Sequence, residues 1–355
     1  MRYYDGIVKQ LRFGILGAAN IARKNWESIF NSGNATVTAV ASRDVGRARR
    51  FIKELQAAAP FAPAPAAVGS YEELLARPDV DAVYVPLPTG LRKEWVLRAA
   101  AAGKHVICEK PCGISTADVQ EMTAACARNR VQFMDGVMFM HHPRLERVRR
   151  VLDDGRSIGQ VKRITSNFSF HLAENAYDTN IRVNSRLEPA GCLGDLGWYC
   201  IRFTLWTMGW RLPREVTGRI LSKRGAVQSR PQVPVDFSAE LIFDDDTSAG
   251  FYCSFIAGYQ NWVHISGTRG QLRVADFVHP RGDLETAFEV NGSMVRVKAA
   301  AVTQQSKMIR NFADQVFSGK LNREWPESAL KTQRVMDACL EAARKGKKVK
   351  LPATI

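Results

Sequence analysis

Short apolar runs alternate with stretches of helical periodicity over the first part of the chain. The helical stretches lie near residues 21–30, 45–55, 93–102 and 116–128. The apolar runs are Leu11–Leu16, 36–41, 82–87, His105–Cys108 and 131–134. Runs of this length read as strands buried on both faces, and strands that alternate with helices are typical of βαβ units. From about Leu11 to Val137, the pattern therefore predicts a doubly wound parallel sheet in an α/β fold.

After about residue 160 the pattern changes to a period of two, which is typical of half-buried strands. These segments are 163–172, 216–223, 235–243, 248–255, 261–266, 271–277, 285–290 and 293–298, and turn sequences such as Asn291-Gly292 join them. The pattern predicts an α+β domain with a large open antiparallel sheet that carries helices on one face. Helices are expected at 193–208 and at about 327–344.

A chain of 355 residues is long enough for two domains of ordinary size. The change of pattern divides it into residues 1–142 and 143–355, and the last helix is expected to pack back on one of the two. No apolar run approaches the roughly 20 residues that a membrane span needs. The first residues lack the apolar core of a secretory signal. We expect a cytoplasmic protein that does not enter a membrane.

The formal net charge of +15 raises the question of nucleic-acid binding. Arginines cluster at 43–50 and 144–150 and lysines at 345–350, but aromatic residues are not interleaved with them and no known nucleic-acid-binding module surrounds them. Solvated helix faces explain these clusters better. The charge would still attract phosphate-bearing cofactors or acidic substrates.

Cysteine and histidine spacing argues against a metal site. The seven cysteines include no Cys-x-x-Cys pair, so buried free thiols are expected. The adjacent His141 and His142 lack a carboxylate partner in register and make poor ligands. We read them as part of a structural turn before Pro143, and we expect no metal.

The first apolar run ends in a turn that resembles the dinucleotide fingerprint Gly-x-Gly-x-x-Gly. Gly17 takes the first position, and Ala19 and Ala22 take the second and third. The first glycine makes the tight turn and the second lets the backbone approach a pyrophosphate. The turn predicts a Rossmann domain in which residues 17–21 contact the cofactor, namely Gly17, Ala18, Ala19, Asn20 and Ile21.

The second run ends in Ser42 and Arg43, with Arg47 one turn further on. An NAD-preferring site usually has an acidic residue here to bind the ribose 2′-hydroxyl. A hydroxyl and guanidinium groups suit a phosphate instead. The sequence therefore favours NADP over NAD, although a capping serine followed by solvated arginines would give the same pattern.

The triplet Glu109-Lys110-Pro111 closes the run His105–Cys108. Ligands of open α/β sheets bind at the carboxyl ends of the strands. Lys110 is therefore expected to face the cofactor rather than bulk water.

The turn at Gly17, the segment Val85-Pro86-Leu87-Pro88, the triplet at Lys110 and the block Gly191-Cys-Leu-Gly-Asp195-Leu-Gly197-Trp-Tyr199 together resemble the glucose–fructose oxidoreductase/inositol dehydrogenase/MocA-like family. The similarity runs from about Leu11 to the carboxyl end, and it is greatest to the dimeric dihydrodiol dehydrogenase and D-xylose dehydrogenase branch. The resemblance implies an NAD(P)-dependent oxidation of a secondary alcohol or anomeric carbon of a sugar or cyclic diol, or the reverse reduction. It also implies a homodimer or homotetramer assembled through the open sheet.

The resemblance implies roles for individual residues. Tyr199 takes the place of the proton-transferring tyrosine, Lys110 lies beside the nicotinamide ribose and the substrate hydroxyl, and Asp195 is their polar companion. Cofactor contacts are also implied for the second strand end and the later strand ends, at Ser42, Arg43, Arg47, Pro86, Leu87, Pro88, Thr89, Glu109 and Lys110. Substrate contacts are implied for Arg182, Arg92 and Tyr199.

Elementary chemistry agrees with these roles. Asp195 and Tyr199 are four residues apart, so they share one face of a helix. A phenol titrates near pH 10, about three units too high for easy proton exchange at neutral pH. The ammonium of Lys110 is expected to lower the pKa of Tyr199.

Two other interpretations stay open, and three departures from the family pattern support the second of them. Thr89 and Arg92 stand where the family has an asparagine and a histidine, and Met140 stands where an arginine is common. Arg92 favours an anionic substrate. The first alternative is a lyase or glycosidase in which redox is transient, and the second is a cofactor-binding regulator without turnover.

Overall fold

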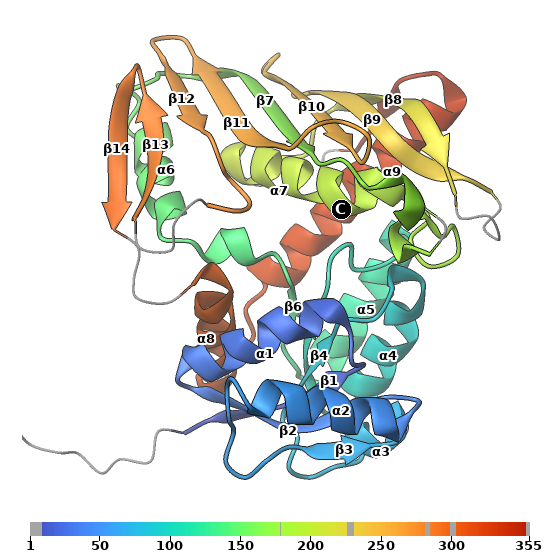
Figure 1. Ribbon diagram of the computed structural model, residues 1–355. Helices are drawn as coiled ribbons and strands as arrows, with labels where there is room; N and C mark the ends of the chain where they lie inside the picture. The colour runs from blue at the N-terminus through green and yellow to red at the C-terminus, as the bar shows by residue number, and fades with distance from the viewer. Residues whose placement is uncertain (1–8, 178, 226–230, 281–284, 299–302, 353–355) are drawn as a thin grey trace, which may run out of the picture.

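A computed structural model describes residues 9–177, 179–225, 231–280, 285–298 and 303–352. Two β-sheets stand apart, with helices between them (Figure 1). The residues before position 9, on which the expectation of no secretory signal rests, lie outside the described range. In the part that is described, no helix has the length and apolar character needed to cross a bilayer.

The first sheet forms from the apolar runs of the first third of the chain. Its six strands within the described residues have the order β3-β2-β1-β4-β5-β6, and all pair in parallel. This is the strand order of a Rossmann domain. The strands are β1 (Leu11–Leu16), β2 (Ala35–Ala41), β3 (Ala66–Val68), β4 (Ala82–Val85), β5 (His105–Cys108) and β6 (Phe133–Asp135).

Helices connect these strands and cover the sheet. They are α1 (Asn20–Ser32), α2 (Val45–Gln56), α3 (Tyr71–Leu75), α4 (Thr89–Ala101) and α5 (Thr116–Arg128). The predicted parallel α/β architecture is confirmed.

The second sheet has nine strands among the described residues, in the order β14-β13-β12-β11-β7-β10-β9-β8-β15. The prediction of a purely antiparallel sheet is wrong, because β7 and β10 pair in parallel along their length. A parallel pair needs a long crossover, and the helical block between β7 and β8 lies within that crossover. The strands are β7 (Val161–Ser169), β8 (Glu215–Arg224), β9 (Val233–Ile242), β10 (Ser248–Ser254), β11 (Gln260–Gly267), β12 (Gln271–Val274), β13 (Glu285–Val290), β14 (Ser293–Lys298) and β15 (Val349–Lys350).

Helices α7 (Trp198–Thr207) and α9 (Glu324–Lys345) lie between the two sheets (Figure 1). Helix α9 packs on β8 and α7 of one half and on α5 and β6 of the other. The expected return of the last helix is thus observed, and it touches both halves.

The sequence interpretation missed the short helix α3 and two longer helices. Helix α6 (Arg144–Asp153) packs on β13, and α8 (Gln304–Phe317) packs on α1 and β2 of the first half. The ring of Phe312 on α8 lies 6.0 Å from that of Phe13 on β1. We propose that the domain boundary lies between residues 142 and 143. With this boundary, helix α8 belongs to the second domain but packs in the core of the first.

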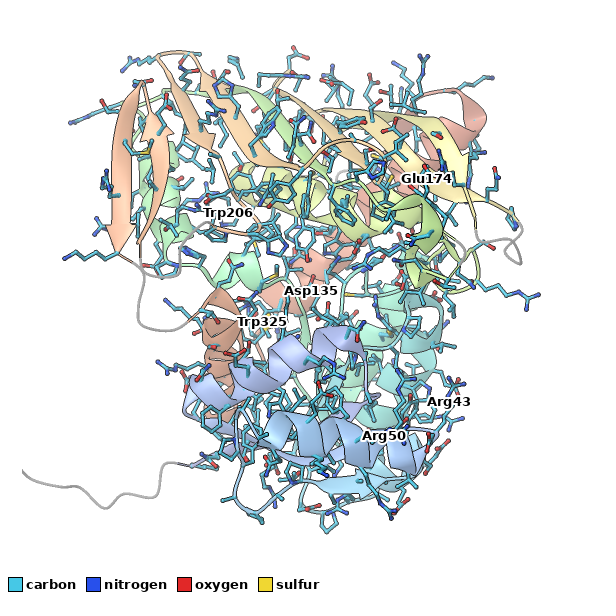
Figure 2. All side chains as sticks on the ribbon, viewed as in Figure 1. Arg43, Arg50, Asp135, Glu174, Trp206 and Trp325 are labelled. Atoms are coloured by element: carbon cyan, nitrogen blue, oxygen red, sulfur yellow. The ribbon has the colours of Figure 1, made fainter. Side chains whose placement is uncertain are left out.

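A buried ion pair joins the two halves. Arg202 on α7 donates to the carboxylate of Asp135 at the end of β6, with N–O distances of 2.5 and 3.2 Å. The side chains are only 2% and 4% exposed. Arg202 also donates to Thr332 on α9, and Figure 2 shows Asp135 between the two sheets. All seven cysteines lie in the described range and are buried and free, as expected.

Candidate active site

The carboxyl end of β5 delivers Lys110 to a carboxylate from the second half of the chain. The strand is buried, and the lysine follows directly after Glu109. Its Nζ donates to Asp195 Oδ1 at 2.6 Å and to the backbone carbonyl of Asp195 at 2.8 Å. The exposed fractions of the two side chains are 10% and 20%. The site therefore holds a fixed ammonium at the strand end, where the sequence predicts it.

Asp195 lies in one turn of π-helix, Leu193–Gly197, that leads into α7. Such turns are frequent at functional sites. A Cβ on Gly194 would lie 3.3 Å from the ring of Pro111, so glycine lets this turn approach the end of β5 closely. The other carboxylate oxygen of Asp195 accepts from Arg182 Nε at 2.8 Å. Asp195 thus bridges two cations.

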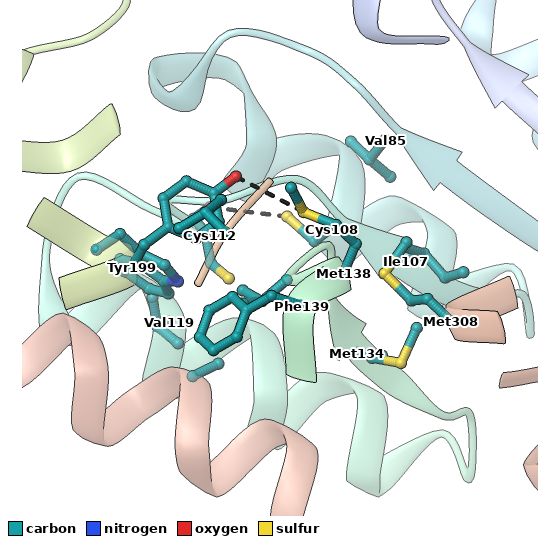
Figure 3. Packing of buried hydrophobic residues seen from close by; sticks show 14 of the residues in the cluster. Val85, Ile107, Cys108, Cys112, Val119, Met134, Met138, Phe139, Tyr199 and Met308 are labelled. Carbon is teal, nitrogen blue, oxygen red and sulfur yellow. Dashed lines mark hydrogen bonds between the residues drawn. The ribbon is translucent and has the colours of Figure 1, made fainter. Parts of the chain in front are cut away.

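Tyr199 lies beside Lys110, one turn beyond Asp195. The Nζ of Lys110 is 4.7 Å from the centroid of the phenol ring. The hydroxyl donates to the sulfur of Met138 at 3.9 Å, as the dashed line in Figure 3 marks. Thioether sulfur is a weak acceptor. The phenolic proton therefore has no strong partner among the described residues.

The charges of the site depart from their ordinary states. Burial raises the pKa of Tyr199 to about 12, and the opposing effect of Lys110 is smaller. Lys110 acts to lower the pKa of Tyr199, as the sequence predicts, but the expected net decrease is wrong because desolvation of the phenolate outweighs the attraction. Burial is the largest single effect on Lys110 and opposes its charge, but Asp195, Tyr199 and Glu109 together outweigh burial and raise the pKa of the lysine. The two cations beside Asp195 overcome burial and lower the pKa of that carboxyl.

The turn after β1 has the geometry of a pyrophosphate cradle. Gly17 has a φ of +111°, which side-chain-bearing residues rarely adopt. Ala19 at the start of α1 offers no side-chain cap, so the first amide groups of the helix remain available to an anion. Ala18 is half-buried, and Asn20 and Ile21 are exposed. These residues fit a bound dinucleotide.

The end of β2 gathers groups that suit a phosphate. Ser42 is buried, and Arg43 and Arg47 are exposed. Arg43 forms no ion pair with any described carboxylate, whereas the neighbouring Arg50 lies 3.6 Å from Asp44; Figure 2 labels both arginines. Arg47 donates to the carbonyl of Ala18 at 3.1 Å, and this bond connects the segment after β2 to the turn after β1.

Sequence reasoning missed Tyr71 on α3. Burial raises the pKa of Tyr71, and Arg43 and Arg47 act against that rise, so the phenol lies close to both arginines. A Cβ on Gly17 would lie 3.4 Å from its hydroxyl. An aromatic residue after a short strand gives no sequence signal that would reveal this position.

The end of β4 is held by internal contacts. Arg92 is buried, and its guanidinium donates to Leu87 O at 2.7 Å, to Thr89 Oγ1 at 2.9 Å and to Pro111 O. Glu188 accepts from the amide and hydroxyl of Thr89. These bonds fix the 86–89 segment, in which Pro86 and Leu87 are buried and Pro88 is half-buried. The geometry gives Arg92 a positioning role, and we leave it out of the substrate contacts that we propose.

Glu109 lies behind the strand end rather than at a surface. Its carboxylate accepts from Tyr84 Oη at 2.6 Å, and Asn25 on α1 donates to the same hydroxyl at 2.7 Å. This chain connects the end of β5 to the helix that begins at the pyrophosphate cradle. Neither Glu188 nor Asn25 stood out in the sequence, because single polar residues carry no pattern.

The two adjacent histidines serve structural contacts. Nδ1 of His141 pairs with Asn311 Nδ2 at 3.0 Å, and Nδ1 of His142 accepts from the amide of Arg144 at 3.0 Å. Over the described part of the chain, no group of three or more His, Cys, Asp or Glu side chains could hold a metal ion.

Comparisons with known proteins identify the family. Residues 11–137 match the model of an oxidoreductase family with an NAD-binding Rossmann fold, and residues 145–273 match the GFO/IDH/MocA C-terminal domain. The D-xylose 1-dehydrogenase (NADP(+)) 2 of Haloferax volcanii is 31% identical over 96% of this chain and 100% of its own length. A bovine trans-1,2-dihydrobenzene-1,2-diol dehydrogenase is 31% identical over 75% of this chain and 74% of its own.

Solved structures agree. A 3-ketoreductase from Actinomadura kijaniata, in complex with NADP and TDP-benzene, has a TM-score of 0.80 and 29% identity, covering 94% of this chain and 98% of that one. The resemblance stated from the motifs is confirmed, and the chain belongs to the GFO/IDH/MocA family of oxidoreductases.

Proposed function

We propose that this protein is an NADP-dependent oxidoreductase that acts on a secondary alcohol or an anomeric carbon of a sugar or cyclic diol, or on the corresponding carbonyl. The main observation in support of this activity is that Lys110, Asp195 and Tyr199 meet at the end of β5. The Nζ of Lys110 lies 4.7 Å from the centroid of the Tyr199 ring, a separation that one small substrate group spans. The NADP-linked names of the similar xylose dehydrogenase and ketoreductase support the choice of cofactor.

The residues divide the chemistry among them. The nicotinamide ring, when bound, supplies the hydride acceptor or donor. Tyr199 gives its proton to, or takes it from, the substrate oxygen. Lys110 stays charged beside Asp195 and stabilises negative charge that develops on that oxygen. Asp195 holds the ammonium in place and is itself held by Arg182, whose exposed guanidinium is a further contact for substrate oxygens.

The test is nicotinamide absorbance at 340 nm during incubation with aldoses, ketoses and cyclic diols. Steady conversion of NADP or NADPH with at least one of them supports the proposal. Product formation without net cofactor conversion would identify the transient-redox alternative. Cofactor binding without either would identify the regulator.

Oxidation of an alcohol is expected to speed up with pH, whereas carbonyl reduction stays nearly constant. The phenol of Tyr199, with a pKa of about 12, keeps its proton at neutral pH. It can therefore donate to a carbonyl oxygen directly but must lose its proton before it can act as a base. Initial rates in both directions between about pH 7 and 10 measure this; equal pH dependence in both directions would contradict it.

Arg43→Ala is expected to raise the KM for NADP by about tenfold or more, because charge-assisted bonds to the 2′-phosphate are lost. The KM for NAD should stay within about twofold. Arg50→Ala is the matched control, since Arg50 is exposed on α2 and lies near Asp44. If Arg43→Ala kept the wild-type preference for NADP over NAD, the 2′-phosphate would have to bind elsewhere.

We also propose that copies associate through the open face of the second sheet. Helices α7 and α9 lie on its inner side (Figure 1). Exposed and half-buried residues alternate along most of strand β8, and its Leu221 is 49% exposed.

A further inference from the structure

His279 lies in the segment that follows β12, and it shares an aromatic neighbour with Tyr199. Its ring centroid is 6.0 Å from that of Phe168 on β7, and Phe168 in turn lies 5.6 Å from Tyr199. Both contacts are edge-on. Phe168 therefore forms a common wall behind the two polar side chains.

Charged residues of both halves of the molecule surround His279. Burial, helped by Lys24 of α1 and by Lys110 and opposed by Asp195, lowers its pKa to about 4. The side chain is nevertheless exposed to solvent. The charged groups that act on it are Lys24 on helix α1 and the Lys110–Asp195 pair of the candidate site.

Buried polar side chains fix the segment that presents His279. Arg144, at 1% exposure, donates to the carboxylate and the carbonyl of Asp276. Asn261 accepts from the amide of Val278 at 3.0 Å, and Gln304 donates to its carbonyl at 2.8 Å. These three residues come from α6, β11 and α8. Fixing a short segment by such bonds restricts the positions that the next side chain can take.

We propose that His279 recognises substrate, by hydrogen bonding to a hydroxyl group other than the one that reacts at Tyr199. This inference rests on the proposed function for the location of the reacting hydroxyl. A neutral imidazole has one donor and one acceptor nitrogen, which matches the donor and acceptor capacity of a hydroxyl. The residue therefore favours a neutral polyhydroxylated substrate, a sugar, over a cyclic diol with a hydrocarbon ring.

The experiment compares wild type, His279→Leu and His279→Gln as complexes with NADP. The probes are D-xylose, D-glucose and the monodeoxy derivatives of each. Calorimetry gives the dissociation constant of each sugar, and absorbance gives KM and kcat separately. His264→Leu is the matched control, because His264 lies on β11 and contacts Gln271 instead.

His279→Leu is expected to weaken binding of the parent sugar by about tenfold and to raise KM equally, with kcat within about twofold. His279→Gln should recover most of that loss. One deoxy sugar should bind wild type and His279→Leu equally, because the hydroxyl in question is already absent.

Equal affinity of wild type and His279→Leu for every sugar would overturn the inference, and so would the lack of any sugar binding by wild type. Loss of affinity for all deoxy derivatives alike would overturn it too, since it would indicate a structural role. Sugar binding that depends on His279 without cofactor conversion would support the inference while contradicting the proposed function.

Discussion

Tyr199→Phe is expected to lower kcat by about 10²- to 10⁴-fold, the usual contribution of a positioned acid or base. The substitution removes only the hydroxyl. The ring keeps its neighbours, since Phe139 and Phe168 lie 6.0 and 5.6 Å away from it. Among the described residues the hydroxyl donates only to the sulfur of Met138, and the nearby Lys110 keeps its two bonds to Asp195, so the substitution leaves no buried polar group without a partner. Steady-state rates and the dissociation constant of NADP, measured side by side, should show lost turnover with unchanged cofactor affinity.

Tyr252→Phe is the matched control for this variant. Tyr252 lies on β10 in the second sheet, away from Lys110. It should keep wild-type kcat within about twofold. Near-normal turnover in Tyr199→Phe would mean that another group moves the proton.

Arg202→Met is expected to destabilise the protein by about 3–5 kcal/mol, because it leaves the carboxylate of Asp135 buried without its cation. The pair is almost fully enclosed, and Arg202 also bonds Thr332, so the loss reaches three elements. Urea titration followed by tryptophan fluorescence should show the transition at a clearly lower concentration.

The double variant Asp135→Leu/Arg202→Met should recover much of that loss, because it removes both charges rather than one. Arg147→Met, an exposed arginine on α6, should change stability by no more than about 0.5 kcal/mol. If Arg202→Met were as stable as Arg147→Met, the ion pair would not hold the two halves together.

The first sheet was largely predictable from sequence. Strands β1 and β5 begin and end where the apolar runs do, because a strand that is buried on both faces consists almost entirely of apolar residues. The second sheet was predictable strand by strand but not in its pairing. Alternation looks the same whether a neighbour runs parallel or antiparallel, so the β7–β10 pair could not be read from it.

Helix α8 left a signal that was overlooked. Met308, Ile309, Phe312 and Ala313 follow helical spacing, and all are buried. Thr303 before them caps the helix by accepting from the amide of Ser306. In α6, by contrast, the apolar positions lie among four arginines, whose charge dominated the interpretation.

Sequence motifs predicted which residues meet at the candidate site. They did not predict properties that depend on the folded chain, such as burial and the partners of buried polar groups. Lys110, Asp195 and Tyr199 come together as the motifs suggest. The direction of the pKa shift of Tyr199 depends on whether burial outweighs the charge of Lys110. The sequence does not show how deeply Tyr199 is buried. Arg92 is a substrate contact in the sequence interpretation, yet it donates to the backbone carbonyls of Leu87 and Pro111, which only the folded chain brings within reach.

The return of α8 to the first half limits how this enzyme can be divided. Its Phe312 is fully buried against Phe13, and Asn34 bonds Asp314 of the same helix at 2.8 Å. A fragment ending near residue 142 would expose that apolar surface and leave Asn34 without this partner. The nucleotide-binding half therefore completes its core with a helix from the other half, and grafting it onto another catalytic domain would require transplanting α8 as well.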